Sequence, residues 1–207
     1  MAIKKQGYIF ILAIVISLSV ITIRAFSIFW IDPSSFLVRV LALWGYAILA
    51  IAALTTPFLK EITQAYGKPF IKIHHIFSVF GLTFTTLHPV AYAIQVLSLT
   101  VFLPRFDSWE IFWSLAGRPA LIILYIALFA ALLRRKSRKY WRFFHALMYI
   151  VLFLGIVHAN LMGTDFQDAG IRIIFDILFL SSVTAFALKR YRNYRIRQIA
   201  KQRSVKE

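Results

Sequence analysis

The sequence predicts an all-α integral membrane protein: a six-helix bundle with both termini in the cytoplasm. Of its 207 residues, 60% are hydrophobic and only 15% are charged. A soluble domain of this size needs more polar surface, which excludes a soluble enzyme. Apolar stretches of roughly 20 residues, the length needed to cross a bilayer, recur six times along the chain. We therefore expect a multi-pass protein of the cell membrane.

The predicted spans are joined by short connections and form one domain over residues 1–207. They cover residues 8–30, 36–58, 73–97, 111–133, 143–162 and 171–188. The first span follows Lys4 and Lys5, as the apolar region of a signal peptide would. It is longer than such a region and has no clear small-x-small cleavage site, so we interpret it as a membrane helix.

Positive charge is concentrated on one side of this arrangement. The N-terminus, the 60–72 and 134–142 loops and the tail lie on the same side and hold all but five of the 24 lysines and arginines. Six of the eight acidic residues lie on the other side. Positive loops stay in the cytoplasm, so both termini are expected there. We attribute the basic tail 189–207 to topology and to attraction for anionic membrane lipid rather than to nucleic acid. Docking of a soluble partner is an alternative.

The ionisable residues inside the spans direct attention to histidine. The chain has no cysteine, which excludes disulfides, iron–sulfur clusters, zinc–thiolate sites, nucleophilic cysteine and covalent haem attachment. The third span carries His74 and His88, and the fifth carries His145 and His158. Both spans run outward from a basic loop, and each pair is separated by about 20 Å of helix. The four histidines therefore sort into an inner pair, His74 with His145, and an outer pair, His88 with His158.

Two imidazoles facing each other from neighbouring helices are the arrangement that axial ligation of a haem iron requires. Two such layers would hold two b-type haems stacked across the membrane. A centre held only by histidine, without cysteine or paired carboxylates, suits haem better than zinc or di-iron. With both axial positions filled, these haems favour electron transfer over binding of oxygen or substrate.

On an ideal helix, the two histidines of the third span lie on the same face, whereas the two histidines of the fifth span do not. His88 lies within about 40° of His74 around an ideal helix, whereas His158 lies about 140° from His145. Bending, a local change of pitch or laterally offset haems must compensate for this angular difference. His75 is an alternative inner ligand, but its phase relative to His88 is equally poor.

Several other residues are placed where a haem would need them. Haem propionates bind cations, and the candidates are Arg39 and Arg118 on the outer side and Lys72 and Arg142 on the inner side. Snorkelling or topology is the alternative explanation for each of these cations. Gly81, midway between the third-span histidines, leaves room for a porphyrin edge or for close helix contact.

The His-x13-His and His-x12-His spacings resemble the ferric reductase-like transmembrane domain of ferric reductases and NADPH oxidases, over about residues 36–188. Shorter segments resemble the haem-binding membrane subunit of the bacterial methionine sulfoxide reductase system. These segments are LTTPF (54–58), LHPVAYA (87–93), GRP (117–119) and the stretch 141–158. The resemblance implies that the four axial haem ligands are His74, His88, His145 and His158.

The chain also departs from these relatives. The methionine sulfoxide reductase subunit commonly has an Arg-Arg pair where this chain has His74 and His75, so the resemblance does not imply a dedicated role in methionine repair. NADPH oxidases carry a further histidine one turn beyond the outer ligand, where this chain has Tyr92, so superoxide production is not implied either. Quinone-linked dihaem cytochromes b have similar histidine spacings, which keeps a quinol-using function open.

No G-x-G-x-x-G or P-loop motif occurs, and the chain ends soon after the sixth span. We therefore expect a separate electron donor, either a flavin reductase carrying FMN or FAD or a membrane quinol. Three functions compete. The first is a transmembrane oxidoreductase that reduces an external metal, an oxygen species or a periplasmic protein. The second is an electron-transfer subunit that supplies a separate external reductase. The third is a haem-free transporter or scaffold.

Overall fold

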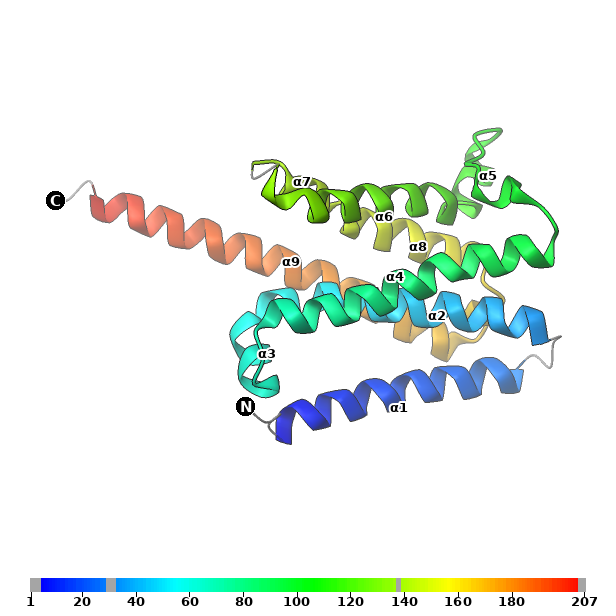
Figure 1. Cartoon of the computed structure of the whole chain (residues 1–207), viewed down its shortest axis with the longest axis horizontal. Coiled ribbons are helices and arrows are strands. Elements are labelled where there is room, and N and C mark those ends of the chain that lie inside the picture. The colour runs from blue at the N-terminus through cyan, green and yellow to red at the C-terminus, as the bar shows by residue number, and fades with distance from the viewer. Residues whose placement is uncertain (1–4, 29–32, 137–138, 205–207) are drawn as a thin grey trace.

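The protein is an elongated bundle of helices. The computed structural model describes residues 5–28, 33–136 and 139–204, and these ranges contain helices and no strand (Figure 1). Helices suit a lipid environment because each one pairs its own backbone groups. The α-helices are α1 (Lys5–Ile28), α2 (Pro33–Leu54), α3 (Leu59–Tyr66), α4 (Phe70–Gln95), α5 (Trp109–Ser114), α6 (Gly117–Leu132), α7 (Trp141–Ala146), α8 (Met148–Met162) and α9 (Ala169–Ser204). Short 3₁₀ helices are η1 (Thr56–Phe58), η2 (Leu99–Phe102), η3 (Leu133–Arg135) and η4 (Thr164–Gln167).

Six helical segments of the described chain are long and apolar enough to cross a membrane, which confirms the six predicted spans. They are Gly7–Phe26, Ser34–Leu54, Phe70–Gln95, Gly117–Arg135, Trp141–Met162 and Ala169–Ile199. The long helices run roughly along the long axis of the bundle (Figure 1). The protein is therefore a multi-pass membrane protein.

Two predicted boundaries are wrong. The fourth span begins at Gly117 and not at 111, because the segment before it forms the separate short helix α5. The Ser108 side chain caps α5 by accepting the N–H of Ile111 at 3.2 Å. A new helix then starts just before Pro119, which is tolerated only in a first turn. The sixth span does not stop at 188 either. Its helix continues through the basic tail to Ser204, since that tail contains no proline or glycine.

The fifth span is divided where the sequence predicted a phase problem. Helices α7 and α8 meet at Leu147, whose N–H bonds to the Phe144 carbonyl at 3.1 Å, three residues back. A bond of this 3₁₀ type winds the chain more tightly than an α-helix does. The division lies between His145 and His158. A local change of pitch is one of the three alternatives named above, and the structure has one at Leu147.

Helices α2 and α4 form the most closely packed pair. Two glycines allow the approach. A Cβ at Gly45 would lie 2.7 Å from the Thr85 backbone nitrogen, and a Cβ at Gly81 would lie 2.8 Å from the Leu49 side chain. Of the two alternatives for Gly81, close helix contact is the one observed. Helix α8 packs similarly along α6, whereas no such extended contact joins α4 to α6 or α8.

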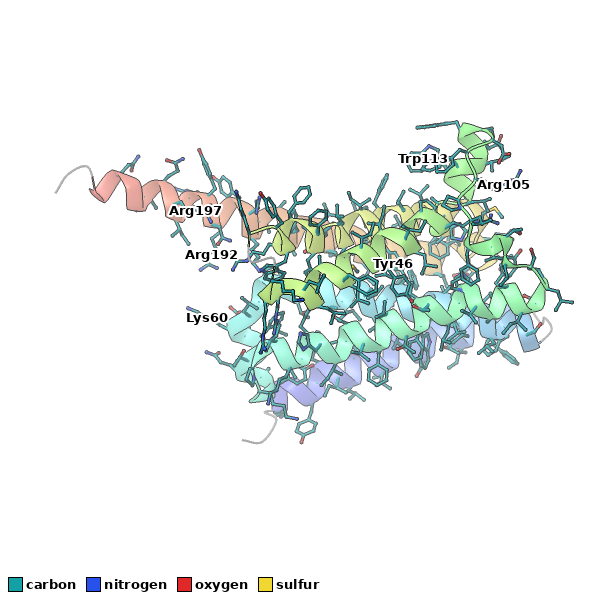
Figure 2. All side chains as sticks on the ribbon, turned by 45° about the horizontal axis from the view of Figure 1, so that its top comes forward. Tyr46, Lys60, Arg105, Trp113, Arg192 and Arg197 are labelled. Carbon is teal, nitrogen blue, oxygen red and sulfur yellow. The ribbon has the colours of Figure 1, made fainter. Side chains whose placement is uncertain are left out.

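The two ends of the bundle differ in charge. The beginning of α1 and the end of α9 lie at the same end, together with α3 and α7 (Figure 1). Lys60, Arg192 and Arg197 lie at that end, and Arg105 and Trp113 lie at the opposite end (Figure 2). This separation agrees with the charge asymmetry of the sequence. Which end faces the cytoplasm stays a prediction. Lys4 and the last two residues of the predicted first span, 29 and 30, lie outside the described residues.

Candidate functional site

The predicted inner pair of histidines comes together between α4 and α7. The ring centroids of His74 and His145 lie 6.2 Å apart with their planes at 83°. Each ring also contacts an aromatic side chain one turn earlier on its own helix. Phe70 stacks on His74 at 5.5 Å, and Trp141 lies tilted against His145 at 6.1 Å. These contacts restrict how either imidazole can turn.

Three of the four predicted ligands direct Nδ1 at a backbone carbonyl of a neighbouring segment. His74 approaches the Ala52 oxygen at 3.3 Å, His88 the Val38 oxygen at 2.9 Å, and His158 the Ser114 oxygen at 2.6 Å. A carbonyl only accepts hydrogen bonds, so Nδ1 must be the protonated nitrogen of these neutral rings. The lone pair of Nε2 is then available to a metal, as in most histidine–metal sites.

Helix ends supply two of these carbonyls. Ser114 is the last residue of α5, and Ala52 lies in the last turn of α2, where carbonyls have no intrahelical donor. Nδ1 of His145 forms no hydrogen bond of good geometry within the described chain, although the Ala127 carbonyl of α6 lies close enough to act on this ring. The Ser78 hydroxyl lies 3.4 Å from Nε2 of His74, a long contact in which Nε2 is the acceptor.

The outer pair lies where α4 and α8 approach α5 and α6. His88 and His158 lie close enough for a charge on one ring to act on the other. The His158 ring packs directly on the backbone of Gly117, the first residue of α6. A Cβ at that position would lie 2.9 Å from Cδ2 and 3.2 Å from Nε2 of the ring. Only glycine leaves this space to the imidazole.

The predicted outer cations have different surroundings. Arg118 donates to the carbonyls of Thr100 at 3.0 Å and Leu103 at 2.9 Å, and its charge acts on His158. Arg39 forms a buried ion pair with Asp165, in which Nε donates to Oδ2 at 2.9 Å. A second Arg39 nitrogen donates to the Ala25 carbonyl. Arg39 therefore ties α2 to α1 and to the α8–α9 connection.

On the inner side, most of the predicted residues are exposed, and the structure adds a cation that the sequence analysis did not single out. His75, Lys72 and Arg142 are exposed, and His74 is half-buried. The missed residue is Lys189 of α9, which is also half-buried. Its Nζ donates to the Thr56 carbonyl at 3.1 Å, and its charge acts on His74. No sequence signal singled out Lys189, because it begins a basic tail with many similar residues.

The described histidines come in pairs rather than in larger groups. No cluster of three or more His, Cys, Asp or Glu side chains occurs in the described ranges. A bare zinc or iron ion needs three or four protein ligands. A pair suits a metal that arrives with equatorial ligands of its own, as the iron of a haem does.

Comparison with known proteins identifies the family of the chain. The family model described as "ferric reductase like transmembrane component" matches residues 40–156, more than half of the chain. The match includes His74, His88 and His145 and ends two residues before His158. No curated protein and no solved structure matches the chain significantly. Ferric reductase-like domains generally bind haem and carry electrons across membranes. The chain belongs to the family of ferric reductase like transmembrane components.

Proposed function

We propose that the protein is a b-type cytochrome that passes electrons across the cell membrane through two haems. His74 and His145 would hold the inner haem, and His88 and His158 the outer haem. The observations that carry this proposal are the proximity of the inner rings and the orientation of three rings. Two imidazoles lie 6.2 Å apart at the inner level, and three of the four rings direct Nδ1 at a backbone carbonyl.

The inner pair fits a single iron between its rings. A histidine–metal bond is about 2 Å long and an imidazole centroid lies about 1 Å behind the ligating nitrogen, so rings on opposite sides of one metal have centroids about 6 Å apart. The His74–His145 separation of 6.2 Å has this size. When bound, the haem supplies reversible one-electron chemistry at iron.

The chain's own residues would set the ligation. The carbonyls of Ala52, Val38 and Ser114 hold three rings in the tautomer in which Nε2 carries the lone pair, and they make the ligating nitrogen more basic. His75 is exposed, which favours His74 as the inner ligand. For the propionates, Arg118 lies near His158 and Lys189 near His74.

Arg39 stays a predicted propionate partner of the outer haem, although its guanidinium binds Asp165 in the structure. Reaching a propionate would require it to share or leave this carboxylate. The ion pair has a second consequence, because Arg39 follows Val38, whose carbonyl receives His88. Arg39 therefore also supports the outer ligand through the backbone of α2.

The direction of transfer follows from topology. With the basic end in the cytoplasm, electrons enter at the inner pair and leave at the outer pair. The donor would be a separate flavin reductase, carrying FMN or FAD, or a membrane quinol. The acceptor would be an external metal, an oxygen species or a periplasmic protein.

Histidine replacement tests the assignment of the two layers. His88→Ala and His158→Ala should each remove the outer haem and leave the inner one, because neither contacts His74 or His145. The measurement is the haem-to-polypeptide ratio of monodisperse protein purified in detergent. Loss of both haems from a variant that stays folded, or loss of neither, would contradict the proposal.

A further inference from the structure

A second site candidate lies on the other side of α4, near the basic end of the bundle. A pocket of about 330 Å³ is bounded by α1, α2 and α4 and by the end of α3. Ligand pockets of this size are common in proteins. Its walls are almost wholly apolar and include Ile14, Ile48, Ile73 and Phe77. The pocket opens toward the outside of the bundle, which a membrane would cover with lipid.

One wall residue of this pocket has an unused polar group. Tyr66 is 4% exposed, and its hydroxyl has no hydrogen-bond partner within the described chain. The Phe10 ring packs edge-on against the Tyr66 ring at 6.2 Å and holds it in place. Burial raises the pKa of Tyr66, so the phenol stays protonated and can donate. A buried donor without a partner is unfavourable, and a ligand with an acceptor would satisfy it.

The rest of the lining indicates the shape of such a ligand. Lys68 lies at the polar end, two residues after Tyr66, whereas Ile11, Val15 and Phe80 extend the apolar lining along α1 and α4. A ligand would therefore have a small head with an oxygen acceptor and an apolar tail. A whole phospholipid, with two acyl chains and a charged head, is larger than a pocket of about 330 Å³ and offers the phenol only its ester carbonyls. A quinone ring is neutral and carries carbonyl acceptors.

We propose that this pocket, defined by Tyr66, Lys68, Ile73 and Phe77, binds a membrane quinone or quinol with its ring beside the Tyr66 hydroxyl. Ile73 immediately precedes His74, so the ring would lie across α4 from the inner histidine pair. Quinone binding requires nothing beyond the pocket, whereas a role as electron donor rests on the proposed function. In that role a quinol becomes a quinone and releases two electrons and two protons. Haems held by the two histidine pairs would take up one electron each, and both protons would leave to water at the Lys68 end.

Binding can be measured directly on the full chain in lipid nanodiscs. Decylubiquinone would compete with a photoreactive azidoquinone, whose attachment is mapped by mass spectrometry. Attachment to the inner halves of α1 and α4 is expected. Tyr66→Phe should weaken decylubiquinone binding about fivefold, the value of one neutral hydrogen bond. Folding should be unaffected, because the hydroxyl has no partner to lose. Tyr194→Phe, an exposed tyrosine on α9, is the matched control.

A second pair of variants fills space instead of removing a donor. Ile76 is a 48% exposed pocket residue, so Ile76→Trp should fill the pocket and weaken binding more than tenfold. Ile122→Trp on α6, where Ile122 is 47% exposed and outside the pocket, is the control. Unchanged binding in both Tyr66→Phe and Ile76→Trp would overturn the proposal. Equal competition by decylbenzene would also overturn it, because the groove would then accept any apolar chain.

The two proposals fail in different ways. Protein that binds decylubiquinone but contains no haem would leave the pocket assignment intact and remove the proposed function. Haems that dithionite reduces and decylubiquinol does not would remove the donor role and leave the haem assignment intact. Rapid haem reduction by decylubiquinol that slows in Tyr66→Phe and Ile76→Trp would support both.

Discussion

Gly117→Ala tests whether the outer histidine pair binds a cofactor. The new Cβ would lie 2.9 Å from Cδ2 of His158, whereas ordinary contacts begin near 3.4 Å. The ring must therefore move by about 0.5 Å, away from a position fixed by its 2.6 Å bond to the Ser114 carbonyl. Overpacking of this kind costs about 1–3 kcal/mol, which corresponds to about a 5- to 150-fold loss of outer-haem affinity.

The assay is haem retention during purification, followed by a redox titration of what remains. We expect Gly117→Ala to lose or weaken the outer haem while the inner haem keeps its content and potential. Gly155→Ala is the matched control on α8, where the added Cβ would meet only the Tyr46 ring, at 3.2 Å. It should keep both haems. Full retention of two haems with unchanged potentials in Gly117→Ala would refute this account of His158.

Three further outcomes are expected. Asp165→Asn leaves a buried arginine without its carboxylate and should lower stability by about 3–5 kcal/mol; thermal melting checks this, with Asp107→Asn, at an exposed pair, unchanged. His74→Ala should remove the inner haem and His75→Ala should not, as haem content will show; equal losses would refute the assignment. Hydrogen bonds, first from the Ile171 N–H and then from an arginine, lower the pKa of Asp168. Its stabilisation is therefore present at neutral pH and is lost as pH falls below the usual carboxyl range, so the melting midpoints of wild type and Asp168→Asn should converge once the pH is below that range.

The spans and the histidine depths were predictable because lipid imposes simple rules. Apolar length defines a crossing helix, and charge asymmetry sorts its ends. Similar spacing then places the histidines of the third and fifth spans at matching depths. The 6.2 Å approach of His74 and His145 agrees with the predicted inner pairing.

The features that the sequence did not predict depend on local backbone hydrogen bonds. The division at Leu147 arises from one hydrogen bond that spans three residues instead of four, and no proline or glycine marks it. The carbonyl partners of His74, His88 and His158 come from segments 22 to 50 residues away in the chain. Such partners follow from helix packing and not from any motif.

Tertiary packing also gives individual residues partners that the sequence did not indicate. Arg39 was predicted as a propionate partner, but the structure pairs it with Asp165, which is 126 residues away. Gly81 was compatible with a porphyrin edge or a neighbouring helix, and Leu49 occupies that side. In both cases the residue type was informative, whereas its partner depended on which helix became its neighbour.

The central claim is that the chain holds two haems between paired histidines. The most direct test is the amount of haem b per polypeptide, measured by pyridine haemochrome on detergent-purified protein expressed with ample haem. A reduced-minus-oxidised spectrum of the same sample reports the spin state. The account predicts two haems per chain, both low-spin. One haem would contradict the two-layer arrangement, and a chain without haem would contradict the proposed function altogether.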